Sequence, residues 1–62
     1  MTFRELYEKI HGKTDIDIVK DGHILLKIKY DWDLKSIPIE IRQAEVDYIQ
    51  AVDYRTIEIR VG

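Results

Sequence analysis

Two pairs of carboxylates stand at a spacing that could hold a metal ion. They are Asp15-x-Asp17 and Asp31-x-Asp33, and alternate residues of an extended chain share one face. Carboxylate oxygens in such pairs suit Mg²⁺ or Mn²⁺. A domain this thin has little depth for substrate phosphates or ordered waters. We therefore interpret the four carboxylates as parts of a solvent-facing surface and expect no metal site.

The two histidines do not fit general-base catalysis. His11 falls at the end of a predicted helix, where the helix dipole favours a cation, and His23 follows a predicted turn. Neither pattern places a nucleophile and a third, orienting group beside an imidazole. The three glycines stand alone, without the spacing of a phosphate-binding loop. We expect no catalytic residue, no cofactor and no enzymatic activity.

The segment Asp31-Trp32-Asp33 has the composition of a binding loop. Trp and Tyr dominate the energetic hot spots of protein interfaces, and carboxylates pair well with guanidinium groups. Trp32 also has the parity of Tyr30 and Leu34, which suits a side chain that closes the core. Its role, core residue or partner contact, stays open on the sequence.

Size and composition limit what these residues can do. The chain has 62 residues, 12 acidic and 10 basic side chains, a net charge of -2 and no cysteine. This length predicts one domain, residues 1–62, with a small core, and the lack of cysteine leaves no disulfide to support it. No apolar run approaches the roughly 20 residues that span a bilayer. We expect a soluble protein of a reducing, intracellular compartment.

The chain opens with the signals of a helix from about Phe3 to His11. Thr2 and Glu5 have the spacing of a capping box, in which each side chain satisfies a free amide at the helix start. Gly12 suits the left-handed residue that ends a helix. An apolar stripe follows the helical repeat and consists of Phe3, Leu6, Tyr7 and Ile10.

A β-hairpin is predicted next, around the turn signal Asp21-Gly22. A two-residue loop would place Ile18 beside Leu25 and scatter apolar side chains over both faces. A turn with a bulge at Gly22 would place Ile18 beside Ile24 and gather the apolar side chains on one face. Because a slip of one residue exchanges the faces, we predict the bulged register.

The second half of the chain predicts another hairpin after an ambiguous segment. Residues 37–43 read either as an edge strand or as one helical turn opened by Pro38, and we favour the helical turn. The second hairpin pairs residues 45–52 with 56–61. Either Val46 and Tyr48 or Ile49 and Ala51 face the core, and the other pair stays outside as an apolar strip.

These elements predict an α+β fold of the order α-β-β-turn-β-β. The N-terminal helix packs on the apolar face of a four-stranded antiparallel sheet, and that sheet is made of the two β-hairpins. The polar side chains of the strands then face solvent.

The order of signals resembles a group of very short proteins encoded by phages and prophages of Firmicutes. The matching residues are Met1-Thr2-Phe3 with Leu6, Ile37-Pro38 with Glu40, Val46 with Ile49, and Ile57, Ile59 and Val61. Some small acidic phage proteins of similar build are type II anti-CRISPR proteins, which inactivate Cas nucleases stoichiometrically. The resemblance implies a bacterial partner protein such as a Cas nuclease, a location in the cytoplasm of the host cell, and carboxylates that imitate nucleic-acid phosphates.

We therefore expect a non-enzymatic protein-binding inhibitor of phage origin, with an anti-CRISPR protein as the first candidate. Its partner-binding residues are predicted to be Asp15, Asp17, Asp31, Trp32, Asp33, Glu45, Asp47 and Tyr48. One alternative is a homo-oligomeric structural or assembly module that pairs through sheet edges or the apolar strip. A second alternative is a weak nucleic-acid binder that uses Lys27, Lys29, Arg55 and Arg60, which the acidic pI of about 5.6 disfavours.

Overall fold

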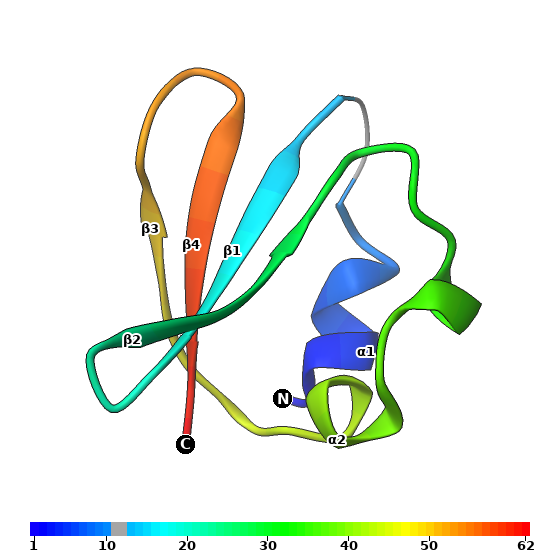
Figure 1. Cartoon of the computed structure of the whole chain (residues 1–62), viewed down its shortest axis with the longest axis vertical. Helices are drawn as coiled ribbons and strands as arrows, with labels where there is room; N and C mark the ends of the chain where they lie inside the picture. The colour runs from blue at the N-terminus through cyan, green and yellow to red at the C-terminus, as the bar shows by residue number, and fades with distance from the viewer. Residues whose placement is uncertain (11–12) are drawn as a thin grey trace.

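The computed structural model describes residues 1–10 and 13–62, so the predicted helix end at His11 and Gly12 lies outside the described residues. The described residues form two short helices, a 3₁₀ turn and four strands, and Figure 1 shows how they are arranged. In chain order these are α1 (Phe3–Tyr7), β1 (Asp15–Lys20), β2 (His23–Ile28), the 3₁₀ helix η1 (Leu34–Ser36), α2 (Ile39–Arg42), β3 (Val46–Ala51) and β4 (Thr56–Val61).

The four strands form one mixed sheet in the order β2-β1-β4-β3. Both predicted hairpins are present and antiparallel, but the central strands β1 and β4 pair in parallel. The prediction of a purely antiparallel sheet was therefore wrong. The α+β class is confirmed.

The parallel pairing follows from the length of the segment between the hairpins. Residues 29–45 carry η1 and α2 and return the chain to the end of the sheet from which β2 started (Figure 1). Parallel strands need a crossover of a dozen or more residues, often helical. Residues 29–45 form such a crossover, so β3 runs parallel to β2 and β4 runs parallel to β1.

The helix α1 starts as predicted and ends earlier. Thr2 Oγ1 accepts the Glu5 N–H at 3.3 Å, and Glu5 Oε1 accepts the Thr2 N–H at 2.9 Å, which completes the capping box. The Thr2 N–H holds the pKa of the Glu5 carboxyl below its ordinary value. After Tyr7 the chain changes to three-residue turns, because the Lys9 and Ile10 amides bond to the carbonyls of Leu6 and Tyr7.

The register of the first hairpin differs from the prediction. Its loop is the two-residue Asp21-Gly22 turn, with φ of 53° and 79°, as a type I′ turn requires. The bulge lies inside β2 instead. Val19 pairs with Ile24 and Ile18 pairs with Leu26, which leaves Leu25 as the extra residue.

A two-residue loop alone would scatter the apolar side chains of the hairpin over both faces of the sheet. The bulge at Leu25 shifts the rest of β2 by one residue and prevents this. Beyond Leu25, Leu26 and Ile28 fall on the face of Ile18 and Ile16, where the core lies. The tight turn and the apolar pattern are both satisfied, at the cost of one unpaired residue.

A second bulge resolves the open question about residues 45–52. The pairing with β4 shifts between Val46 and Tyr48, so Asp47 is the extra residue. Val46, Ile49 and Ala51 then share the core-side face, while Tyr48 turns to the opposite face. The alternative with Ile49 and Ala51 toward the core was right for these two residues and for Tyr48, and it was wrong for Val46, because the bulge changes the parity within the strand.

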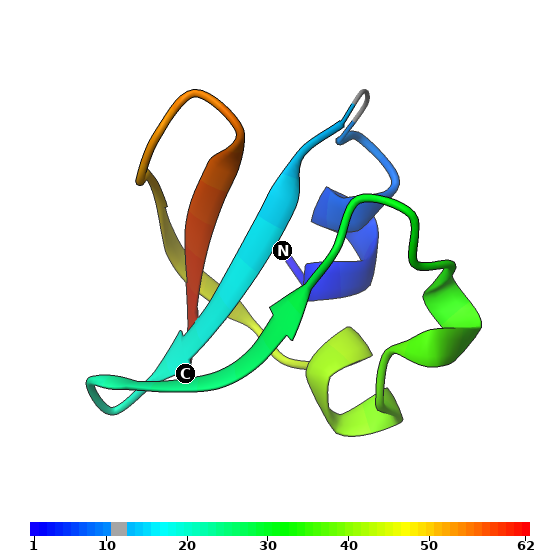
Figure 2. The ribbon, with the colours of Figure 1, turned by 45° about the horizontal axis from the view of Figure 1, so that its top comes forward.

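The core lies on one side of the sheet only. Figure 2 shows α1 and α2 together on one side of the sheet. Residues 37–43 adopt the predicted helical turn, with Pro38 before α2 and Ile37 and Ile41 buried. The buried cluster consists of Phe3, Ile16, Ile18, Ile28, Ile37, Ile41, Ile59 and Val61.

Candidate functional site

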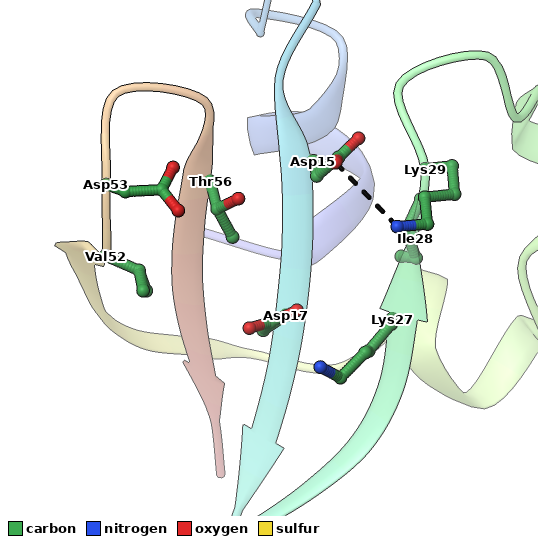
Figure 3. A pocket seen from close by; sticks show the side chains of 8 residues that line it. All are labelled: Asp15, Asp17, Lys27, Ile28, Lys29, Val52, Asp53 and Thr56. Atoms are coloured by element: carbon green, nitrogen blue, oxygen red, sulfur yellow. Dashed lines mark ion pairs between the residues drawn. The ribbon is translucent and has the colours of Figure 1, made fainter.

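The face of the sheet opposite the helices is the candidate site. Ile18 and Ile59 pair within the core, so their neighbours along the strands point to the other side. Figure 3 shows this side, with the helical layer behind the strands. We call it the open face, and it consists of Asp15, Asp17, Val19, Lys27, Tyr48, Gln50, Thr56, Glu58 and Arg60.

Three side chains on β3 and β4 hold one another in place. The Tyr48 hydroxyl donates to Glu58 Oε2 at 3.2 Å, and the Arg60 guanidinium carbon lies 4.5 Å from the centroid of the Tyr48 ring. All three side chains are half-buried, and Arg60 Nε is buried without a hydrogen-bond partner. The stacking leaves the other guanidinium nitrogens of Arg60 as donors that an incoming carboxylate could meet.

Two carboxylates meet at the centre of the open face. Asp17 on β1 stands directly opposite Glu58 on the parallel strand β4, and Lys27 stands opposite Asp17 on its other side. Like charges in directly opposed positions destabilise a sheet. Lys27 therefore offsets the repulsion between Asp17 and Glu58. The fold itself does not require two like charges at these positions.

A shallow pocket of about 270 Å³ lies at the upper end of the open face (Figure 3). Asp15 lies in it, with Oδ1 accepting the Tyr30 N–H at 3.0 Å and Oδ2 3.9 Å from Lys29 Nζ. The side chains that line it are Asp15, Asp17, Lys27, Ile28, Lys29, Val52, Asp53 and Thr56. Three carboxylates and two ammonium groups thus share one pocket, which suits an ionic contact with a protein surface better than a small anion.

An apolar corner borders the open face at its opposite end. Val19 is buried outside the main core cluster, and Ile24 pairs with it across the β1–β2 ladder. The bulge sets Leu25 beside Ile24, and the two side chains are 52% and 51% exposed. Two large aliphatic side chains therefore remain in water next to a charged surface.

The predicted binding loop lies in the helical layer and not on the open face. Trp32 is half-buried against the core, and its carbonyl accepts the Tyr7 hydroxyl at 2.8 Å. Asp33 caps η1 by accepting from the N–H and hydroxyl of Ser36, both at 3.2 Å. Trp32 therefore packs against the core. Asp31 beside it is exposed.

The last two predicted site residues lie at the rim. Glu45 Oε2 lies 3.1 Å from the amino group of Met1 and so tethers the chain start to β3. Asp47 is the exposed bulge residue of β3 and lines a second hollow, of about 370 Å³, with Arg60 and Asp21. Of the eight predicted residues, the structure brings together Asp15, Asp17 and Tyr48 on the open face.

Sequence reasoning did not include Glu58 in the site and assigned Arg60 only to nucleic-acid binding. The alternation of residues 56–61 indicates that Glu58 and Arg60 face away from the core. The pattern of a single strand does not tell which strand lies beside it in the sheet. The parallel β1–β4 register is the missing information, because it puts Glu58 against Asp17.

Over the described ranges 1–10 and 13–62, no group of three or more His, Asp or Glu side chains is arranged to hold a metal ion. None of the helices in the same ranges is long and apolar enough to cross a membrane.

The fold and the open face together define a small α+β protein with a half-covered mixed sheet. Comparison with protein-family models, with curated proteins and with solved structures finds no match for this chain.

Proposed function

We propose that the protein acts without catalysis, as an inhibitor that binds another protein through the β3–β4 part of its open face. The observation that supports this proposal is the Tyr48–Glu58–Arg60 cluster. Tyr and Arg are the residue types that most often dominate binding energy, and a side chain already held in place loses less entropy on binding. The cluster has both properties.

The dimensions of the molecule suit a protein partner. Its broad side measures 25 × 24 Å, and a standard interface takes about 800 Å² from each partner. A side of this size leaves room for such an area once residues around the β3–β4 part take part, whereas the hollows at Asp15 and at Asp47 are shallow. A macromolecular surface fits this shape better than an enclosed small molecule.

The charges of the open face favour a partner surface that is itself mixed in charge. Asp15, Asp17 and Glu58 would meet arginines or lysines, and Arg60 would meet a carboxylate. The likeness to phage proteins suggests a Cas nuclease as the partner, with Asp15 and Asp17 directed at its basic cleft. Full imitation of a nucleic-acid backbone is a poorer fit, because Lys27 and Lys29 lie directly beside Asp17 and Asp15.

The test is inhibition of target-DNA cleavage by a purified type II Cas nuclease with its guide RNA. The wild-type protein is expected to inhibit at a stoichiometric ratio. The Tyr48→Ala variant is expected to need at least about 30-fold more protein, since truncating a hot-spot residue costs 2 kcal/mol or more. Tyr30→Ala is the matched control, because it removes the same side chain from the turn after β2 and should inhibit like the wild type.

Two outcomes contradict the proposal in different ways. Absence of both inhibition and nuclease binding removes the Cas nuclease as the partner. Equal inhibition by Tyr48→Ala and the wild type removes the β3–β4 part of the open face. The variant Asp31→Lys tests the crossover loop in the same assay without disturbing the Asp33 cap, and a loss of inhibition confined to Asp31→Lys would move the site to that loop.

A further inference from the structure

The β1–β2 half of the open face, taken together with Lys29 and the bordering apolar corner, has a regular pattern of three rows. In the first row Lys29, directly after β2, places its Nζ 3.9 Å from Oδ2 of Asp15 on β1. In the second row Lys27 stands opposite Asp17. The third row is apolar and consists of Ile24 opposite Val19, with Leu25 at the bulge.

This pattern is complementary to itself under a twofold rotation. The rotation axis runs parallel to the strands and midway between β1 and β2. The rotation places the side chains of β2 in one copy over the side chains of β1 in a second copy. Lysines then lie over aspartates in two rows, and Ile24 lies over Val19 in the third. Because the axis runs along the strands, each row meets the same row, and every contact occurs twice.

We propose that this β1–β2 half-face binds a second copy of the same chain in an isologous, face-to-face dimer. The apolar row supplies the burial, since Ile24 and Leu25 are each about half exposed in the single chain. The two ionic rows fix the relative position of the copies, because a shift of one strand would place lysine over lysine. A second copy is the occupant that the charge pattern fits without any further assumption.

Pairing through the sheet edges is a weaker route to the same oligomer. Both edge strands carry a bulge, at Leu25 in β2 and at Asp47 in β3. Bulges and charged residues on edge strands are devices that prevent edge-to-edge pairing. The two bulges thus disfavour pairing at the sheet edges, whereas the open face remains exposed.

The dimer goes beyond the proposed inhibitory function, and its interface shares only Asp15 and Asp17 with the surface proposed for the partner. The rotation covers β1 and β2 of each copy and leaves the Tyr48–Glu58–Arg60 cluster uncovered on both. A partner and a second copy therefore compete for these two carboxylates and not for the cluster. Failure of either proposal leaves the other standing.

The interface is small, so the association is expected to be weak and concentration-dependent. Two of four strands take part, which places the buried area below the roughly 800 Å² per partner of a standard interface. Ion pairs in two of three rows make the association sensitive to salt. In sedimentation equilibrium at low salt, the apparent mass should rise with concentration from 7.4 kDa towards twice that value, and it should fall back in 0.5 M salt.

The decisive experiment mixes two charge variants. Asp17→Lys leaves two lysines in the second row, and Lys27→Asp leaves two aspartates there. Each variant alone places like charges against each other and should remain at the monomer mass. An equimolar mixture of the two restores opposite charges across the interface and should regain the concentration-dependent rise in mass.

Circular dichroism and thermal unfolding of each variant establish that it is folded before the mass is measured. Leu25→Asp serves as a further variant that leaves both ionic rows unchanged and should also stay monomeric. The proposal is overturned if the wild type stays at 7.4 kDa at every concentration, if the mixture is no heavier than its components, or if both single-charge variants associate like the wild type.

Discussion

At the scale of single residues, Tyr7 connects the N-terminal helix to the crossover segment. Its ring lies 5.5 Å from the ring of Phe3, and its hydroxyl donates to the Trp32 carbonyl at 2.8 Å. Burial raises the pKa of the Tyr7 phenol, and the negative charge of Asp33 raises it further. One hydrogen bond therefore holds the crossover against the N-terminal helix.

The variant Tyr7→Phe is expected to lower the free energy of unfolding by about 0.5–1.5 kcal/mol, because it leaves the Trp32 carbonyl without this donor. Urea unfolding at pH 7 measures the loss, and Tyr30→Phe is the control. The raised pKa of Tyr7 also makes the free energy of unfolding depend on pH in the alkaline range. The folded state retains the phenolic proton longer than the unfolded chain, so this contribution is full below the ordinary tyrosine pKa and is lost as the pH rises through the raised pKa.

The loss on Tyr7→Phe should therefore shrink between those two pKa values. A difference between wild type and variant that stays constant across the alkaline range would show that the phenol titrates alike in the folded and unfolded states. No difference at any pH would show that Tyr7 stabilises the fold by the packing of its ring alone. The Tyr7 hydroxyl would then carry none of the coupling between helix and crossover.

At the scale of elements, the β1–β2 hairpin depends on two consecutive residues with positive φ. Asp21 and Gly22 have φ of 53° and 79°, a conformation that costs an ordinary side chain roughly 1–2 kcal/mol. A Cβ atom on Gly22 would meet nothing within 4 Å. The requirement for glycine therefore comes from the backbone and not from crowding.

Gly22→Ala is expected to lower the free energy of unfolding by about 1 kcal/mol or more through this backbone cost. Asp21→Asn is the matched control, since asparagine tolerates the left-handed region and Asn-Gly is a preferred pair for this turn. Chemical unfolding of both variants checks the prediction. Equal stability of Gly22→Ala and the wild type would mean that the turn adopts another conformation in solution.

Most elements could be predicted from the sequence, because their signals are local. The capping box at Thr2 and the helical turn after Pro38 are set by neighbours within three or four residues. The two bulges were misjudged or missed, because a strand reveals its parity only against its partner. The same holds for the candidate site, where Tyr48 joins Asp15 and Asp17 only through the β1–β4 pairing.

At the scale of the whole molecule, a small core sets the margin of stability. A chain of 62 residues is expected to be stable by roughly 3–9 kcal/mol, at about 0.05–0.15 kcal/mol per residue. Ile59 lies on the central strand β4 and is fully buried, with Ile18 opposite it on β1. A change at this position affects both hairpins together.

Ile59→Val is expected to lower the free energy of unfolding by about 0.5–1.5 kcal/mol, because it leaves a methyl-sized void in the core. Ile24→Val removes the same methylene from a side chain that is 52% exposed and should change the stability by less than about 0.5 kcal/mol. Thermal and urea unfolding of both variants give the comparison. A cost at Ile24 as large as at Ile59 would contradict the one-sided core.

The parallel contact between β1 and β4 joins residues that are far apart in the chain, such as Asp15 and Thr56. During synthesis on the ribosome, β1 therefore waits for its central neighbour until the codons of β4 have been translated. Each hairpin can close by itself beforehand, but two isolated hairpins are marginal in water. Cooperative folding therefore begins only after β4 has left the ribosome. Until then the isoleucines of the nascent chain stay exposed to water, where a chaperone that binds apolar segments can protect them.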